Sequence, residues 1–349
     1  MQIIAAAERI ERHFNLSRAE ARAVMEELLS GTLPDDAIVR LLVALRDKGE
    51  TPQEVVGFAE VMRARAAKVL SGAGVNLEEL ARGEPMLDTC GTGGDGRGTF
   101  NVSTATALVA AAAGVRVAKH GNRSISSRCG SADVLRELGV SLELPLGRIP
   151  ACLAQVGMVF LYAPHLHLAM KHVMNARRSL KTKTVFNLLG PLTNPLGATV
   201  QLVGIYDRAR LGLMAEALRA VGTRRAFVVA AHDGVDEIST SGPTETAEVD
   251  GKEIRHREIQ PENFGLERAP EGAFRGGDAA FNAELLRRVL GGEAGPYRDV
   301  VLANASAALV AAGKARDWKE GVQCAGETLD SGAARKTLAA LIEFTSLAR

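Results

Sequence analysis

From about residue 85 onward, short apolar runs alternate with stretches of helical composition, and this alternation limits the fold more than any other feature. The apolar runs are MLDTC, VRVAKH, VSLEL, GMVFLY, TVQLVGIY and RRAFVVAA, with helical stretches at 104–114 and 132–138 between the earlier ones. Such alternation is typical of βαβ units, in which helices connect parallel strands. The sequence therefore predicts an α/β fold with a central, mostly parallel sheet flanked by helices. The Asp250-Gly251 pair inside TAEVDGKEIRHREI predicts a tight hairpin that adds antiparallel strands.

The first 72 residues have a different pattern, with helical signals and no strand signals. Ser17 and Thr51 each begin a capping box, which a glutamate three residues later closes. Apolar side chains recur at helical spacing after both boxes, and short helices cannot bury such stripes alone. We therefore expect a small all-helical domain over residues 1–72, ahead of a larger α/β domain.

The charge balance excludes broad electrostatic attraction to nucleic acid or to an anionic membrane. The 349 residues include 42 lysines and arginines and 41 aspartates and glutamates, a net charge of +1. No apolar run approaches the roughly 18 residues of a membrane span, and the N-terminus lacks the pattern of a secretory signal. The four cysteines are far apart and include no C-x-x-C pair, so neither a zinc ribbon nor a disulfide framework is indicated. We expect a soluble, cytoplasmic protein that binds any anion locally.

A glycine-rich segment, GTGGDG at 91–96, follows the first predicted strand. Glycines let several backbone N–H groups point into one concavity, which is how many phosphates are bound. The segment also satisfies the G-x-G-x-x-G dinucleotide pattern, but a dinucleotide fold begins its helix inside the glycine run and ends its second strand with an acidic residue. Here the helix begins only at Asn101, and the second strand ends with Lys119 and His120. A basic strand end favours a phosphate over a ribose diol.

Further polar residues follow the glycine segment along the same predicted edge of the sheet. Asn101, Ser103 and Thr104 open the next helix, where free N–H groups and the helix dipole favour anions. A helix cap needs only one such residue. The presence of three therefore favours a second contact with phosphate, either direct or through a bound metal ion. KHGNRSISS at 119–127 and GSAD at 130–133 add lysine, arginine and hydroxyl side chains after the second strand. These residue types at a strand's carboxyl end are candidate phosphate ligands.

Two adjacent carboxylates, Asp236 and Glu237, follow the predicted strand RRAFVVAA. Neighbouring carboxylates repel one another unless a cation lies beside them. Magnesium is bound by one or two protein carboxylates together with phosphate oxygens, so these residues predict a magnesium site on the phosphate-binding edge. An acidic turn without a metal is the alternative interpretation.

Two other patterns fall between residues 165 and 195. His165-Leu166-His167 has the H-x-H spacing of a metal-dependent hydrolase barrel, but too little chain follows for an eight-fold barrel. Arg177 and Arg178 lie on a predicted helix ahead of FNLLGPLTNP. Either arginine is by default a surface charge, but one turned inward would bind a carboxylate with two parallel hydrogen bonds.

In their order and spacing, these segments resemble those of the anthranilate phosphoribosyltransferases, a transferase family related in fold to the pyrimidine nucleoside phosphorylases. The matching stretches span nearly the whole chain: GTGGDG at 91–96, FNVST at 100–104, KHGNRSISS at 119–127, GSAD at 130–133, FNLLGPLTNP at 186–195, GVDEIS at 234–239 and NASAALVAAGKA at 304–315.

The resemblance implies transfer of the 5-phosphoribosyl group from phosphoribosyl diphosphate to the amine of anthranilate, with release of pyrophosphate, in tryptophan biosynthesis. It implies that phosphoribosyl diphosphate is held by Gly91, Gly94, Asp95, Thr99, Asn101, Ser103, Thr104, Lys119 and Ser131. Anthranilate would face Gly91, Asn122 and Arg177, with Arg177 binding its carboxylate. Two magnesium ions would be held by Ser103, Asp236 and Glu237. No general base is assigned, because charge stabilisation of the leaving diphosphate and positioning of the amine suffice.

The resemblance also implies a division of the chain. Helices around residues 168–190 would complete the small domain of residues 1–72, and residues 73–167 and 191–349 would form the domain that binds phosphoribosyl diphosphate. The helical domain would hinge against the α/β domain and form the contact of a homodimer. Departures from the family's common pattern fall in the hinge segment: Leu168 and Asn175 each replace a proline, and LKTKT at 180–184 replaces LGxRT.

Two alternatives come from other functional classes. A nucleoside phosphorylase of related fold would release a free base in a phosphate-dependent reaction, but it gives no role to Arg177 or to GPLTNP. A non-catalytic, nucleic-acid-binding relative would need a basic surface, which the net charge of +1 disfavours unless the basic residues are strongly segregated.

Overall fold

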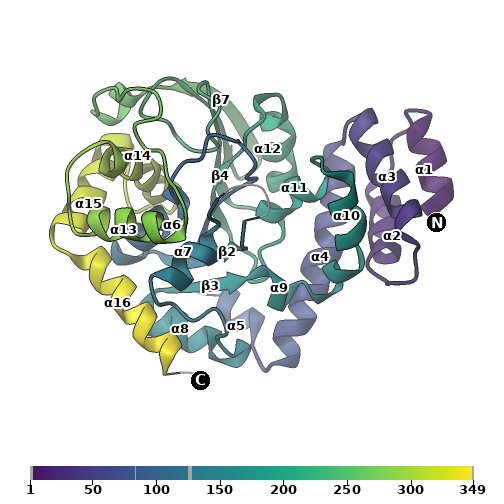
Figure 1. The fold of residues 1–349 in the computed structure, drawn as a ribbon, viewed down its shortest axis with the longest axis horizontal. Helices are drawn as coiled ribbons and strands as arrows, with labels where there is room; N and C mark the ends of the chain where they lie inside the picture. Colours follow the sequence, from purple (N-terminus) through teal and green to yellow (C-terminus); the bar gives the residue numbers. More distant parts are fainter. Residues whose placement is uncertain (1–2, 83, 125–127, 348–349) are drawn as a thin grey trace.

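A computed structural model describes residues 3–82, 84–124 and 128–347. Figure 1 shows an α/β body built on one sheet, with the N-terminal helices gathered at one end of the molecule. The predicted α/β class with a mostly parallel sheet and a helical N-terminal part is confirmed. The last three residues of KHGNRSISS, Ile125, Ser126 and Ser127, lie outside the described residues.

Seven strands form the sheet in the spatial order β3-β2-β1-β4-β5-β6-β7. Their bounds are β1 Met86–Gly91, β2 Arg116–Gly121, β3 Met158–Tyr162, β4 Val200–Gly204, β5 Arg225–Ala231, β6 Thr244–Asp250 and β7 Glu253–Ile259. The first five strands are parallel, so their carboxyl ends share one edge of the sheet. The predicted hairpin is confirmed, because β6 and β7 pair antiparallel with Asp250 opposite Glu253 across Gly251.

The sheet is covered on both faces, which explains why its central strands are continuous apolar runs. Successive side chains of a strand point to opposite faces. In β5, Phe227 and Val229 accordingly pack into the core beneath the C-terminal helices, whereas Ala226 and Val228 pack into the core shared with the N-terminal helices.

The N-terminal part contains α1 Ile3–Glu11, α2 Arg18–Leu28, α3 Asp35–Lys48, α4 Pro52–Gly72 and α5 Leu77–Ala81. Both predicted capping boxes are confirmed: Ser17 and Thr51 accept hydrogen bonds from the backbone of Glu20 and Glu54, and both glutamates bond back. Glu54 is fully buried and forms an ion pair with Lys48 at 3.0 Å. The second box therefore also ties α3 to α4.

The remaining helices cover the sheet and connect its strands. They are α6 Val102–Ala112, α7 Ser131–Glu137, α8 Ile149–Val156, α9 Ala163–Leu166, α10 Met174–Leu180, α11 Phe186–Leu189, α12 Leu211–Ala220, α13 Ala279–Leu290, α14 Pro296–Ala311, α15 Trp318–Asp330 and α16 Ala333–Ser346. Short 3₁₀ turns occur at Leu146–Arg148, Leu168–His172, Gly190–Leu192, Arg208–Arg210 and Pro261–Phe264. None of the helices within the described ranges is long and apolar enough to cross a membrane.

Helix α10 packs against α3, and Val173, Ala176, Val185 and Phe186 share one hydrophobic core with the N-terminal helices. The same core includes residues of α12 and one face of β5. A segment far along the chain therefore completes the packing of the N-terminal helices. In Figure 1, α4, α10 and α11 stand between helices α1–α3 and the sheet.

One predicted strand is wrong. The run VSLEL at 140–144 does not pair with the sheet, which ends at β3. Val140 and Leu144 are buried in the main core instead, and the backbone N–H of Ser141 donates to Thr345 Oγ1 on α16 at 3.1 Å. Alternating apolar residues indicated a half-buried strand, but here they pack under a helix within the crossover from β2 to β3.

Candidate active site

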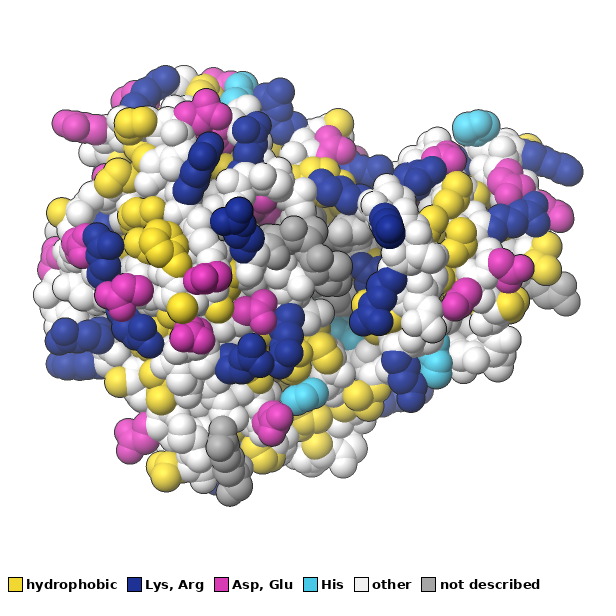
Figure 2. All heavy atoms as spheres, in the orientation of Figure 1, with side chains coloured by type: hydrophobic (Ala, Val, Ile, Leu, Met, Phe, Trp, Pro, Cys, Tyr) yellow, Lys and Arg dark blue, Asp and Glu magenta, His cyan; other side chains and the backbone are white. Residues whose placement is uncertain are grey.

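A cavity of about 350 Å³ opens where the parallel strands end. Its lining includes twelve of the thirteen residues that the sequence singled out: Gly91, Gly94, Asp95, Thr99, Asn101, Ser103, Lys119, Asn122, Ser131, Arg177, Asp236 and Glu237. Thr104 is the exception, since it is fully buried on α6 behind this lining. Figure 2 shows a hollow between the α/β body and the helical part, with lysine and arginine side chains on its rims.

The glycine segment takes a backbone path that only glycine adopts readily. Gly93, Gly94, Gly96 and Gly98 have φ of 64°, 75°, 70° and 65°, in the left-handed region that side chains with a Cβ disfavour. The backbone N–H of Gly93 points inward and donates to Asp236 Oδ2 at 3.0 Å. The backbone of the glycine segment therefore lies along the cavity, where a phosphate could approach it closely.

Two other glycines are required because Asp236 packs directly against the ends of the strands. A Cβ on Gly91 would lie 2.4 Å from Asp236 Oδ2. A Cβ on Gly204 would lie 1.5 Å from the Asp236 carbonyl oxygen, a contact that no side chain could relieve. Gly91 and Gly204 are paired in register on β1 and β4. The loop that carries Asp236 can therefore rest on the strand ends only if both positions lack side chains.

Three carboxylates meet at this edge: Asp95, Asp236 and Glu237. Burial, together with the charge of Asp95, raises the pKa of Asp236 to about 6. Burial and the charge of Asp236 also raise the pKa of Glu237 well above its usual range. Glu237 Oε1 accepts a hydrogen bond from the backbone N–H of Ser103 at 3.1 Å. Burial and mutual repulsion thus disfavour the charged forms of Asp236 and Glu237.

This arrangement fits a magnesium ion. Asp95 Oδ2 is buried and has no hydrogen-bond partner in the described part of the chain, and a cation beside Asp236 and Glu237 would favour the charged forms that burial disfavours. Within residues 3–82, 84–124 and 128–347, no three His, Cys, Asp or Glu side chains form a complete metal-binding group. Magnesium does not need one, because it keeps several waters and takes oxygens from a bound phosphate. Asp236, Glu237 and the Ser103 hydroxyl are suitable protein ligands.

Lys119 lies beneath the cavity and is fully buried. Its ammonium donates to the carbonyl oxygen of Thr89 and to Ser103 Oγ, the latter at 3.3 Å. Burial lowers its pKa, and the nearby Asp88 carboxylate opposes that shift. Lys119 therefore supplies a positive charge directly below the hydroxyl of Ser103.

Asp88 is a buried carboxylate that organises the strand ends. It accepts hydrogen bonds from the His120 backbone N–H at 3.1 Å and from Asn194 Nδ2 at 2.9 Å. Burial raises its pKa to about 6, although Lys119 lowers it in opposition. Asn194 belongs to GPLTNP and also donates to the carbonyl oxygen of Ala118 at 2.8 Å. These hydrogen bonds of Asn194 explain the unusual composition of GPLTNP, because they hold the segment against β1 and β2.

The turn after β2 is held by Asp133. Its Oδ2 accepts hydrogen bonds from the backbone N–H groups of Ser124 and Gly130, at 3.1 and 3.0 Å. Ser131 Oγ donates to the carbonyl oxygen of Asn122 at 3.4 Å. Asn122 and Ser131 therefore lie on one side of the cavity, on a turn whose shape is fixed by a carboxylate that does not line it.

Arg177 reaches the cavity from α10, on the opposite wall. Its guanidinium lies 4.9 Å from the centre of the Phe186 ring, and burial lowers its pKa. No ion pair joins it to a carboxylate within the described ranges. A half-buried guanidinium without an acidic partner is suited to a carboxylate ligand. Arg178 is exposed and does not line the cavity.

The H-x-H pattern does not form a metal site. His165 is exposed and packs edge-on against Tyr162, with ring centres 4.9 Å apart. His167 is buried against His120, with ring centres 5.1 Å apart. Burial lowers the pKa of His120 to about 3 and that of His167 to about 4, so both are neutral near pH 7.

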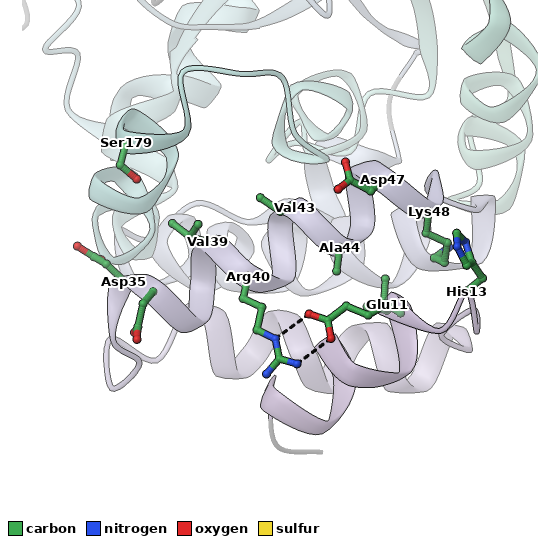
Figure 3. A pocket seen from close by; sticks show the side chains of 12 residues that line it. Glu11, His13, Asp35, Val39, Arg40, Val43, Ala44, Asp47, Lys48 and Ser179 are labelled. Carbon is green, nitrogen blue, oxygen red and sulfur yellow. Dashed lines mark hydrogen bonds and ion pairs between the residues drawn. The ribbon is translucent and has the colours of Figure 1, made fainter.

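A second, larger hollow of about 770 Å³ lies between α1, α3 and α10. Figure 3 shows its lining, in which Val39 and Val43 stand beside an ion pair between Arg40 and Glu11. Both hydrogen bonds of that pair measure 2.7 Å. This hollow has no glycine loop and no cluster of repelling charges, so its size alone does not make it a catalytic site.

The sequence reasoning missed several contributors to the cavity. Cys90, Phe186, Asn187, Gly190 and Cys129 also line it. Asp88 was detectable as a charged residue inside an apolar strand. The other residues carry no local signal, because their place in the lining depends on how α11 and the turn after β2 pack.

Comparison with known proteins agrees with this geometry. Residues 83–335 match the α/β domain of a glycosyl transferase family, and residues 5–66 match the helical bundle domain of a glycosyl transferase family. The anthranilate phosphoribosyltransferase of Solibacter usitatus is 49% identical over 338 residues, which cover 97% of both chains. That of Rubrobacter xylanophilus is 50% identical over 336 residues, covering 96% of this chain and 94% of the relative.

Solved structures agree as well. The anthranilate phosphoribosyltransferase of Thermus thermophilus has a TM-score of 0.87 and 42% identity, covering 98% of this chain and 99% of that chain. The Saccharomyces cerevisiae enzyme, in complex with phosphoribosyl diphosphate and magnesium, has a TM-score of 0.85 and 26% identity, covering 99% of this chain and 98% of that chain. By sequence and by structure along nearly its whole length, the chain belongs to the anthranilate phosphoribosyltransferase family of glycosyl transferases.

Proposed function

We propose that this protein transfers the 5-phosphoribosyl group from phosphoribosyl diphosphate to the amine of anthranilate and releases pyrophosphate, as a step of tryptophan biosynthesis. One observation carries the proposal: a glycine loop, buried carboxylates and an arginine with no acidic partner among the described residues line the same cavity. A phosphoribosyl transfer needs these three features, because it binds a phosphate, stabilises a leaving diphosphate and orients an acceptor. The alternatives of a nucleoside phosphorylase and a nucleic-acid-binding protein have no comparable support.

The donor would lie across the glycine loop. Its phosphates and ribose would be held by Gly91, Gly94, Asp95, Thr99, Asn101, Ser103, Thr104, Lys119 and Ser131. Thr104 would act from behind the lining, through the start of α6. Backbone amides in fixed positions can stabilise an anion without reorganising as the reaction proceeds.

Asp236, Glu237 and Ser103 would hold magnesium, and we propose two ions. Bound magnesium would neutralise charge on the diphosphate as it leaves. The residues fit this task because their carboxylates are buried and repel one another in the absence of a cation. Lys119 would add a fixed positive charge below Ser103.

Anthranilate would enter from the helical side of the cavity. Arg177 would bind its carboxylate with both arms of the guanidinium, and Gly91 and Asn122 would face the ring. The amine of anthranilate is unprotonated near neutral pH, so positioning matters more than removal of a proton. No side chain is therefore needed as a general base.

We propose that residues 1–72 and the helices around 168–190 form one domain, and that residues 73–167 and 191–349 form the other. The packing of α10 on α3 supports this division. Closing the two domains over the ligands would exclude water, which would otherwise hydrolyse the donor.

We also propose a homodimer formed through the helical domain. The hollow in Figure 3 is lined by Val39 and Val43 of α3, and Ile4 and Phe14, also in the N-terminal part, are 54% and 59% exposed. An apolar surface of this kind on an otherwise polar helical layer is suited to a second copy of the chain. A cytoplasmic location is part of the same proposal. Light scattering of wild-type protein and of a Val39→Asp, Val43→Asp variant would test the dimer.

A fluorescence assay tests the activity. Anthranilate is fluorescent, and its signal should fall when phosphoribosyl diphosphate and Mg²⁺ are added together, but not when either is omitted. A variant with Asp236→Asn and Glu237→Gln should lower turnover by roughly 10²-fold or more, on the scale of losing preorganised charge stabilisation. Unchanged magnesium-dependent turnover in that variant would refute the proposal, as would phosphate-dependent cleavage of a pyrimidine nucleoside without consumption of anthranilate.

A further inference from the structure

Lys183 occupies an unusual position on the connection between α10 and α11. Its ammonium lies 2.9 Å from the centre of the Tyr206 ring. Tyr206 follows β4 by two residues, and β4 ends at Gly204 in direct contact with the loop that carries Asp236. The connection belongs to the helical side of the molecule, because Val185 and Phe186 pack into the core of the N-terminal helices. Lys183 therefore reaches from the helical side toward the acidic edge of the sheet.

The charges around Lys183 are negative. Partial burial lowers its pKa, and the carboxylates of Asp207, Asp95 and Asp236 oppose that shift. Lys183 in turn lowers the pKa of Asp95 and of Asp236 against their burial. No ion pair joins Lys183 to any carboxylate within the described part of the chain. The ammonium is thus electrostatically coupled to Asp95 and to the proposed metal ligand Asp236, but forms no ion pair with either.

A contact with an aromatic face is a weaker interaction than a charge-assisted hydrogen bond to an anion. The ring of Tyr206 can therefore hold the ammonium in place while leaving it available for a stronger partner. Phosphates entering the cavity would bring such a partner next to Asp95 and Asp236, the two carboxylates to which Lys183 is coupled.

We propose that Lys183 binds the diphosphate of the donor and of the pyrophosphate product, reaching it from the helical side of the molecule. This inference rests on the proposed function and adds a ligand-binding residue to it. It also links ligand binding to domain closure, because the diphosphate would then be held by the sheet edge on one side and by the helical side on the other.

The matched variants are Lys183→Met, which removes the charge but keeps the length, and Lys183→Arg, which keeps the charge. Lys181→Met is the control, since Lys181 lies on the same connection but is exposed and is not among the groups coupled to Asp95 or Asp236. Binding of magnesium pyrophosphate to each protein would be measured by isothermal titration calorimetry. A thermal melt in EDTA would verify that each variant is folded.

We expect Lys183→Met to weaken magnesium pyrophosphate binding roughly tenfold, the scale of one charge-assisted contact. Lys183→Arg should stay within about threefold of wild type, and Lys181→Met should be unchanged. Equal binding by wild type and Lys183→Met would overturn this inference alone. Tighter binding by Lys183→Met would also overturn it, because Lys183 would then compete with the metal. If wild type itself fails to bind magnesium pyrophosphate, the proposed function fails as well.

Discussion

Replacing Asp236 by asparagine should make the metal-free protein more stable while removing its ability to use magnesium. The substitution keeps the size of the side chain but removes one of three mutually repelling carboxylates. The Gly93 N–H that donates to Asp236 Oδ2 at 3.0 Å can donate to the asparagine oxygen instead. The expected gain therefore comes from relief of charge repulsion and burial.

The magnitude follows from the pKa of Asp236, which burial and the charge of Asp95 raise from 3.8 to about 6. Each pKa unit corresponds to about 1.4 kcal/mol, so ionised Asp236 destabilises the metal-free fold at pH 7.5 by about 3 kcal/mol. The hydrogen bond from Gly93 already contributes to that pKa, so a neutral asparagine of the same shape should gain about the whole 3 kcal/mol. At about 2.1 cal/mol/K per residue, the unfolding entropy of the 349 residues converts this to a rise in Tm of about 4 °C.

The stability gained by Asp236→Asn should depend on pH. Because the folded pKa lies above the unfolded one, the folded state binds the proton more tightly, and the destabilisation is absent below about pH 4 and complete above about pH 6. The advantage of Asp236→Asn should therefore shrink to about half at pH 5. Differential scanning calorimetry in EDTA at pH 5 and pH 7.5 would measure it.

A control variant in the same loop shows whether the rise in Tm is specific to Asp236 or follows the loss of any carboxylate there. Asp233 accepts a hydrogen bond from Ser239 Oγ at 2.6 Å and is not among the groups that shift the pKa of Asp236, so Asp233→Asn should give no rise in Tm. Magnesium pyrophosphate should raise the Tm of wild type but not that of Asp236→Asn. A lower Tm for Asp236→Asn in EDTA, or an advantage that does not change with pH, would refute the reasoning.

Three further outcomes are expected. Lys181 follows α10 with φ of 47°, a left-handed conformation that favours glycine, and the family commonly has glycine there. Lys181→Gly should therefore raise the free energy of unfolding by about 1 kcal/mol in urea titrations. A loss of stability would contradict this. Arg177→Lys should raise KM for anthranilate roughly tenfold and leave KM for phosphoribosyl diphosphate unchanged, because lysine cannot bind a carboxylate with a planar fork; equal changes in both would argue against the assignment. Asn194→Ala should lower the free energy of unfolding by about 3 kcal/mol in urea, because it removes the side-chain donor from the buried Asp88 Oδ2 and the hydrogen bond to the Ala118 carbonyl oxygen. A loss under about 1 kcal/mol would contradict the proposed role of Asn194.

The fold followed from the sequence wherever local patterns and tertiary packing agree. The capping boxes at Ser17 and Thr51 and the hairpin at Asp250-Gly251 are local features, and all are present. The prediction for the run VSLEL failed because Val140 and Leu144 are buried in the main core without pairing to a strand, and the Ser141 N–H bonds to Thr345 of α16 instead. An alternating apolar pattern indicates that one face of a segment is buried, but it does not indicate which element of the fold covers that face.

The candidate site followed from residue chemistry only in part. Glycines and adjacent carboxylates at strand ends were sufficient to locate the cavity, because the carboxyl ends of parallel strands meet at one edge. The role of Asp88 depends on a contact with Asn194, more than 100 residues away in the sequence. The role of Lys183 depends on a contact with Tyr206, less than 30 residues away. Spacing along the chain could not indicate either contact.

The account depends on the donor diphosphate lying between the glycine loop and the acidic edge of the sheet. A crystal structure with phosphoribosyl diphosphate and Mn²⁺ in place of Mg²⁺ tests this most directly, since manganese is located by its anomalous signal. The account predicts manganese beside Asp236, Glu237 and Ser103, with the diphosphate over Gly91–Gly96. Manganese and diphosphate bound elsewhere on the molecule, or a cavity that stays empty while the donor is consumed, would contradict it.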